Sequence, residues 1–197
     1  MALMRRIAGV LAAAALGCGS GGGSGGNSFN GTVHGQGMKP ADAISSTAKV
    51  ALASINANVL SIVLTDSAGT CAKVSANSDP KSAKALIILL ADFNAFVITP
   101  PAGTGTFTVY DPRSAGLPPA HVAVATFAVS DASCDEVPAQ SAVATSGSVT
   151  LTSGSGGTYA GTFTIGFDSG DQVTGEFRTA DCPGLPTYLS NATHSCG

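Results

Sequence analysis

Three histidines are the residues of this chain best suited to proton transfer near neutral pH. They are His34, His121 and His194, and they lie far apart in the sequence. A Ser-His-Asp triad is assembled in space, so distance along the chain does not exclude one. Serine is abundant, however, and no pattern joins a particular serine to a particular histidine. We therefore expect surface or strand-end histidines, and we assign no catalytic residue.

Acidic side chains offer a second kind of chemistry. Asp168 and Asp171 flank the turn sequence DSGD, where carboxylate oxygens could hold calcium. Aspartates at turn ends more often hydrogen-bond their own backbone. Glu136 and Glu176 supplement the aspartates, and no spacing pairs two acids for glycoside cleavage. Because the histidines are scattered and no C-x-x-C occurs, we expect neither a metal site nor a cofactor.

The first 18 residues have the layout of an export signal. Arg5 and Arg6 precede an apolar segment, residues 7–16, which is shorter than the roughly 20 residues of a membrane-spanning helix. The sequence ALGC, residues 15–18, resembles the lipobox of bacterial lipoproteins. In that family the cysteine, here Cys18, is lipidated and becomes the new N-terminus.

This resemblance implies a signal peptide at residues 1–17, acyl chains on Cys18 and attachment to a membrane of the cell envelope. Gly19 stands where an aspartate retains many lipoproteins at the inner membrane, which by resemblance favours the outer membrane. Residues 18–28 are then the lipidated cysteine and a flexible Gly/Ser tether with a reach of roughly 17 Å. The G-x-G-x-x-G and G-x-S-x-G patterns in this tract lack the strand and helix that those motifs need.

The other cysteines become an even set once Cys18 is assigned to lipid. They are Cys71, Cys134, Cys182 and Cys196. An even number in an exported chain predicts two disulfide bonds, and four cysteines allow three pairings. We expect Cys71–Cys134, which would join two loops that each follow a strand ending in Asp, and Cys182–Cys196, which would close a local loop at the C-terminus.

From Phe29 onward the apolar residues alternate with a period of two, which is typical of half-buried strands. The clearest segment, residues 143–179, predicts a three-strand antiparallel meander with a hairpin turn at Gly170. Three of the strands upstream of the meander are more continuously apolar, so we expect them to be more deeply buried. The upstream strands are expected at residues 29–35, 58–66, 84–92, 105–111 and 121–131, and one short helix at residues 39–49.

The predicted fold is a single all-β domain over residues 29–197, an antiparallel β-sandwich or small β-barrel with at most one short helix. Charged residues make up 11% of the chain, and its formal net charge is −3. No basic cluster is available to follow a phosphate backbone, so we expect no nucleic-acid binding.

The leading hypothesis for function is a non-enzymatic structural or binding module, held at a membrane through lipid on Cys18. One alternative is an envelope hydrolase with a scattered Ser/His/Asp site that uses His121 or His34. It would require a polar cleft with a histidine beside a serine and an aspartate. The other alternative is a carrier of a small apolar ligand, which would require a cavity inside a barrel.

Overall fold

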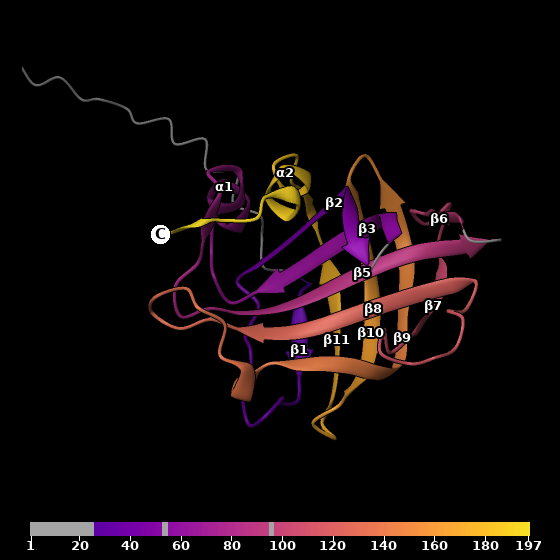
Figure 1. Cartoon of the computed structure of the whole chain (residues 1–197), viewed down its shortest axis with the longest axis horizontal. Coiled ribbons are helices and arrows are strands. Elements are labelled where there is room, and N and C mark those ends of the chain that lie inside the picture. Colours follow the sequence, from indigo (N-terminus) through magenta and orange to yellow (C-terminus); the bar gives the residue numbers. More distant parts are fainter. Residues whose placement is uncertain (1–25, 53–54, 95–96) are drawn as a thin grey trace, which may run out of the picture.

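The structure is a computed structural model that describes residues 26–52, 55–94 and 97–197 (Figure 1). The expected signal peptide, Cys18 and most of the tether lie outside these residues. The elements are β1 (Ser28–Asn30), β2 (Asp42–Leu52), β3 (Ile55–Thr65), α1 (Thr70–Ser75), β4 (Ser78–Asp79), β5 (Lys84–Asn94), β6 (Val97–Thr99), β7 (Gly105–Val109), β8 (His121–Val129), a 3-10 turn (Pro138–Gln140), β9 (Ala142–Ser155), β10 (Thr158–Phe167), β11 (Gln172–Arg178), β12 (Ala180–Asp181), α2 (Leu185–Ser190) and β13 (Ser195–Cys196).

One large curled sheet forms a half-barrel, so the all-β fold class is confirmed. Its strand order is β1-β11-β10-β9-β7-β8-β5-β3-β2-β12, with β6 paired to β5. Most neighbouring strands are antiparallel, while β7 and β8, and β12 and β2, are parallel. In Figure 1 the strands β2, β3, β5 and β8 cross in front of β9, β10 and β11 at a steep angle.

The core fills the concave side of this sheet. Leu86, Ile88 and Leu90 of β5 point into it and have no exposed surface. Phe127 of β8 and Ile165 of β10 belong to the same apolar cluster and are equally buried. The strands expected at 58–66, 84–92 and 121–131 are confirmed as β3, β5 and β8, and the expected meander as β9, β10 and β11.

The segment 39–49, expected to form a short helix, instead forms most of β2, so that prediction is wrong. β2 pairs with β3 over its full length of 11 residues without a break in register. Ser45 and Ser46 obscured the alternation, because both are buried although serine is polar. Pairing with β3 supplies backbone partners along the whole strand, which outweighs a weak local preference for helix.

Three of the expected strands, β1, β7 and β8, are shorter than predicted. β1 ends at Asn30, because Gly31 has a φ of 112° and turns the chain away from the sheet. Val33 and Gln36 then pair in an isolated bridge beyond the strand. β7 ends at Val109, two residues before the end of the segment expected at 105–111, and β8 ends at Val129, two residues before the end of the segment expected at 121–131.

Two short helices form where the sequence predicted loops, whereas at most one was expected. α1 and α2 pack against each other beside β2 (Figure 1). Val74 of α1 and Leu185 of α2 pack with Ile44 of β2 in a second apolar cluster, which is separate from the core. The helices therefore cover one part of the outer face of the sheet.

Candidate binding pocket on the outer face of the sheet

A second strip of apolar side chains lies on the outer face of β3, β5 and β8. In β5, Leu90 belongs to the core, whereas Leu89 and Ala91 belong to a separate cluster on the opposite face. Val59 of β3 and Val124 of β8 are in that outer cluster. A strand that is apolar on both faces needs cover on both sides.

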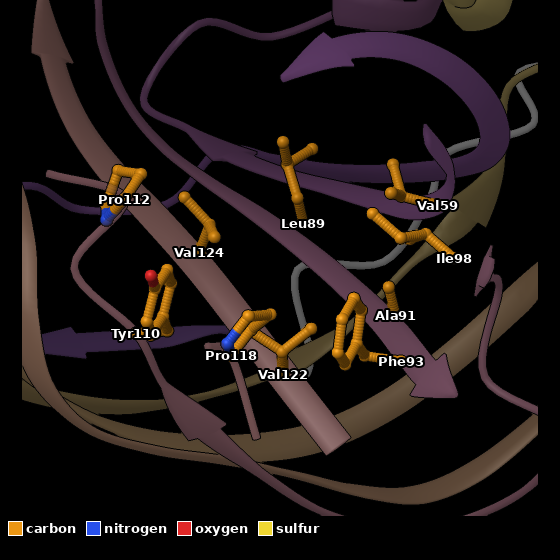
Figure 2. Close-up of a pocket in the computed structure, with 10 residues that line it drawn as sticks. All are labelled: Val59, Leu89, Ala91, Phe93, Ile98, Tyr110, Pro112, Pro118, Val122 and Val124. Carbon is orange, nitrogen blue, oxygen red and sulfur yellow. The ribbon is translucent and has the colours of Figure 1, made fainter. Parts of the chain in front are cut away.

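Two segments fold over this strip and convert it into a pocket of about 260 Å³ (Figure 2). β6 returns along β5, where Phe93 pairs with Ile98. The chain between β7 and β8 crosses the other side and contributes Tyr110, Pro112 and Pro118. In Figure 2 the rings of Phe93 and Tyr110 lie on either side of Pro118.

The wall of this pocket is almost entirely apolar. Of the ten described residues that line it, only Tyr110 carries a polar side-chain atom. The Tyr110 hydroxyl lies 2.5 Å from the carbonyl oxygen of Gly116 and 3.2 Å from that of Ser114, and it donates its proton to this loop. The pocket therefore offers dispersion contacts and little hydrogen bonding, which suits an uncharged apolar group.

His121, the first residue of β8, forms a polar pair with Asp92 of the neighbouring strand β5. Its Nδ1 lies 2.8 Å from Oδ1 of Asp92, whose Oδ2 accepts the backbone N–H of Ala102. The His121 side chain is 64% exposed, and its ring makes a T-shaped contact with the ring of Phe107. This carboxylate orients an imidazole as in a hydrolase triad, but among the described residues no serine hydroxyl is hydrogen-bonded to the ring. For the hydrolase alternative, the described residues therefore offer a histidine paired with an aspartate, and no serine is assigned as the nucleophile.

His194 lies on the C-terminal segment that follows α2. Its ring stacks on Tyr188 with 4.0 Å between centroids. Its Nε2 is 3.0 Å from the Tyr188 carbonyl oxygen, and its Nδ1 is 3.2 Å from the carboxylate of Asp79. The Tyr188 hydroxyl donates to the same carboxylate, and burial raises the pKa of Tyr188 above its ordinary value, with the nearby Asp79 adding to the shift. These contacts fasten the C-terminal segment.

His34 lies against the turn between β10 and β11. Its backbone N–H and the Ser169 hydroxyl both donate to Asp171, and these hydrogen bonds lower the pKa of that carboxyl. The contact therefore uses the backbone of His34 and ties the segment after β1 to the turn.

Asp168, at the other end of that turn, accepts hydrogen bonds from Arg113 and from the Val143 backbone. The Arg113 guanidinium holds the pKa of Asp168 below its usual value. Glu136 pairs with Ser130 in an isolated bridge, and Glu176 lies on β11 opposite β1. Among the described residues, no group of three or more potential metal ligands occurs. The calcium hypothesis therefore gains no support.

The cysteines pair differently from the sequence-based expectation. Cys71 bonds to Cys182, and Cys134 bonds to Cys196, with Cα–Cα distances of 5.5 Å and 5.6 Å. The expected Cys71–Cys134 and Cys182–Cys196 pairs are therefore wrong. The reason is tertiary: α1 packs beside α2, which joins the first pair, and β13 pairs with β4, which brings Cys196 to the loop of Cys134. All four cysteines are used, as the even count predicted.

The residues of the pocket were not identified from the sequence. One signal was present, because the continuous apolar run from Leu86 to Ala91 leaves Ile87 and Leu89 on the face opposite to the core. That run predicts a second apolar face and does not say which segment covers it. The cover consists of β6 and a proline-containing loop, which sequence patterns mark only as turns.

No protein-family model matches the chain, and neither a curated protein nor a solved structure matches it. In the described ranges, no helix has both the length and the apolar character needed to cross a bilayer.

Proposed function

We propose that this chain is a lipid-anchored protein of the cell envelope whose β-domain binds a small apolar ligand in the outer-face pocket. The observation that carries the proposal is the pocket wall, in which Val59, Leu89 and Val124 form a floor between Phe93 and Tyr110. The role is binding without catalysis. The anchor follows from the resemblance of residues 15–18 to a lipobox.

The size of the pocket limits the ligand. A cavity of about 150 Å³ lined by aliphatic and aromatic side chains stays dry and takes up benzene. By that comparison, a pocket of about 260 Å³ has room for roughly ten carbon atoms. The concave side of the sheet, by contrast, holds packed core side chains such as Phe127 and Ile165. The ligand of this proposal therefore lies on the outside of the half-barrel, in contrast to the carrier hypothesis drawn from the sequence.

Binding can be tested with naphthalene, an uncharged probe of ten carbon atoms. Its addition to the purified full-length chain should shift the methyl NMR signals of Val59, Leu89 and Val124 in a saturable manner. Val124→Phe should weaken binding by roughly tenfold or more, because the larger ring occupies the pocket. Ile87→Phe is the matched control, since Ile87 lies on the same strand face outside the lining and should leave binding unchanged.

Two outcomes would count against the pocket. One is the absence of any saturable shift with the wild-type chain. The other is equal binding by the wild-type chain and the Val124→Phe variant, which would place the probe elsewhere. Ala91→Leu fills the same space with a side chain smaller than phenylalanine, and it serves as a second variant if Val124→Phe does not fold.

The anchor is tested separately in cells. Cys18→Ser should abolish palmitate labelling and move the protein from the membrane fraction to the soluble fraction, because stable attachment requires acyl chains. Ser20→Ala, two residues further along the chain, is the control and should remain membrane-bound. Unchanged labelling of Cys18→Ser would refute lipidation at this cysteine.

A further inference from the structure

The loop between β7 and β8 forms one wall of the pocket. Pro112 and Pro118 of this loop line the pocket, and Leu117, next to Pro118, is 73% exposed. The two ends of the loop are tied to the sheet, because the Tyr110 N–H donates to the Ala123 carbonyl oxygen and the Phe93 N–H donates to the Ala120 carbonyl oxygen. The hydrogen bonds of the Tyr110 hydroxyl end on carbonyl oxygens of the same loop, so they do not hold its middle against the sheet. Surface loops with few bonds to the rest of the fold open at low free energy unless something restrains them.

Arg113, which lies beside Pro112, supplies such a restraint. Its Nε and Nη2 donate to the two carboxylate oxygens of Asp111 at 2.9 Å and 3.1 Å. Its Nη1 donates to Oδ2 of Asp168 at 2.7 Å. Asp111 belongs to the loop and Asp168 to the turn after β10, so one guanidinium joins the two. A planar guanidinium can hydrogen-bond two carboxylates at once in this way, and a lysine ammonium cannot fully reproduce the arrangement.

The Asp168 end of this link is fixed to the sheet. Its Oδ1 accepts the Val143 backbone N–H at 3.1 Å, and its own N–H donates to the Val143 carbonyl oxygen at 3.0 Å. Asp111 and Asp168 are the acidic groups that face Arg113. Among the described residues, the hydrogen bond from Arg113 to Asp168 is the side-chain hydrogen bond that connects residues 111–119 to the β10–β11 turn.

We propose that Arg113 is a positioning residue that latches the β7–β8 loop over the pocket and so sets the rate at which the apolar ligand enters and leaves. This inference rests on the proposed function. Opening of the latch moves Pro112 and Pro118 away from the sheet and exposes the floor of the pocket to solvent. When the loop is closed, it retains a bound ligand, and Arg113 itself does not contact that ligand.

The test is the exchange rate of naphthalene, measured by methyl relaxation dispersion on the full-length chain. Arg113→Gln should raise the dissociation rate about two- to fivefold, the range that an exposed ion pair can supply. Asp168→Asn should do the same, because it removes the charge at the sheet end and leaves the loop sequence intact. Lys81→Gln removes one exposed positive charge elsewhere and should have no effect.

Salt and a conservative variant separate the latch from a merely structural role. High salt should accelerate exchange in the wild-type chain towards the Arg113→Gln rate, and it should change that variant little, because exposed charges are screened. Arg113→Lys should restore only part of the slow exchange. Wild-type exchange rates in both Arg113→Gln and Asp168→Asn would overturn the latch and leave the pocket intact. Failure of the wild-type chain to bind naphthalene would refute the proposed function, and the latch with it.

Discussion

Buried hydroxyl groups on β2 and β3 differ in how their hydrogen-bonding capacity is used. The Ser45 hydroxyl lies 2.6 Å from the Thr179 hydroxyl and donates to the Gly157 carbonyl oxygen at 2.8 Å. Thr179 lies between β11 and β12. β11 pairs with β10 and β12 pairs with β2, so this contact lies where the chain passes from pairing with β10 to pairing with β2. Ser61 is equally buried, and among the described residues its hydroxyl has no partner.

This difference predicts that serine-to-alanine substitution changes stability differently at the two positions. Ser45→Ala should lower the free energy of unfolding by about 1–3 kcal/mol, because it leaves the buried Thr179 hydroxyl and the half-buried Gly157 carbonyl oxygen without one of their hydrogen bonds. Ser61→Ala should leave stability unchanged or raise it by about 1 kcal/mol, since it removes a buried hydroxyl that gains nothing. Urea unfolding of the two variants beside the wild-type chain measures both effects. Equal losses in the two variants would contradict the assigned contacts.

At the scale of elements, the β9–β10 pair depends on a very close approach of two strands. Gly147 of β9 has a φ of 116°, and a Cβ atom there would collide with the Thr164 carbonyl oxygen of β10. The register of the pair shifts nearby, between Gly166 and Phe167. Gly170, in the hairpin turn that follows β10, has a φ of 84° with nothing within 4 Å of the same position.

Two glycine variants distinguish backbone conformation from close packing. Gly170→Ala should lower the free energy of unfolding by about 1–2 kcal/mol, because an alanine with this positive φ is strained although the space around it is open. Gly147→Ala should lower the free energy of unfolding by at least about 3 kcal/mol, because its Cβ would also clash with the backbone of β10. Thermal unfolding measures both. Similar losses in the two variants would show that β9 and β10 are not packed as closely as described.

At the scale of the whole molecule, the two disulfides join segments that are distant in sequence. Cys71–Cys182 spans 111 residues, and Cys134–Cys196 spans 62. The first holds α1 against α2, and the second holds the C-terminal strand β13 beside the loop after β8. Long closed loops restrict the unfolded chain most, so each bond should stabilise by about 4–5 kcal/mol in the chain-entropy model.

Peptide mapping without reduction tests this connectivity. After trypsin, Cys182 and Cys196 share the peptide 179–197, while Cys71 and Cys134 lie in peptides 50–73 and 114–178. The structure predicts one species that links all three peptides. The expectation from sequence instead predicts a linked pair and a separate internally bonded peptide. A further cut after Tyr188 should leave Cys71 attached to the Cys182 half, and attachment to the Cys196 half would contradict the assignment.

The sequence by itself determined the elements that have one core face and one solvated face. In the meander β9–β11, residues such as Phe163 and Ile165 alternate with threonines, which specifies the buried face, and the turn at Gly170 specifies the hairpin. The pattern of β2 did not determine its element, because the first half of the strand is covered on both faces and includes buried serines. Lipidation of Cys18 remains a prediction from the motif at residues 15–18.

Only the tertiary structure decided the disulfide partners and the pocket. The cover over Leu89 comes from β6 and from the loop of Pro112 and Pro118, and no local pattern states where those segments will lie. Cys182 meets Cys71 because two short helices pack on the outer face of the curled sheet, and helices of that length form mainly through such packing. Local patterns specify which face of a strand is apolar, whereas the path of distant chain segments decides what covers it.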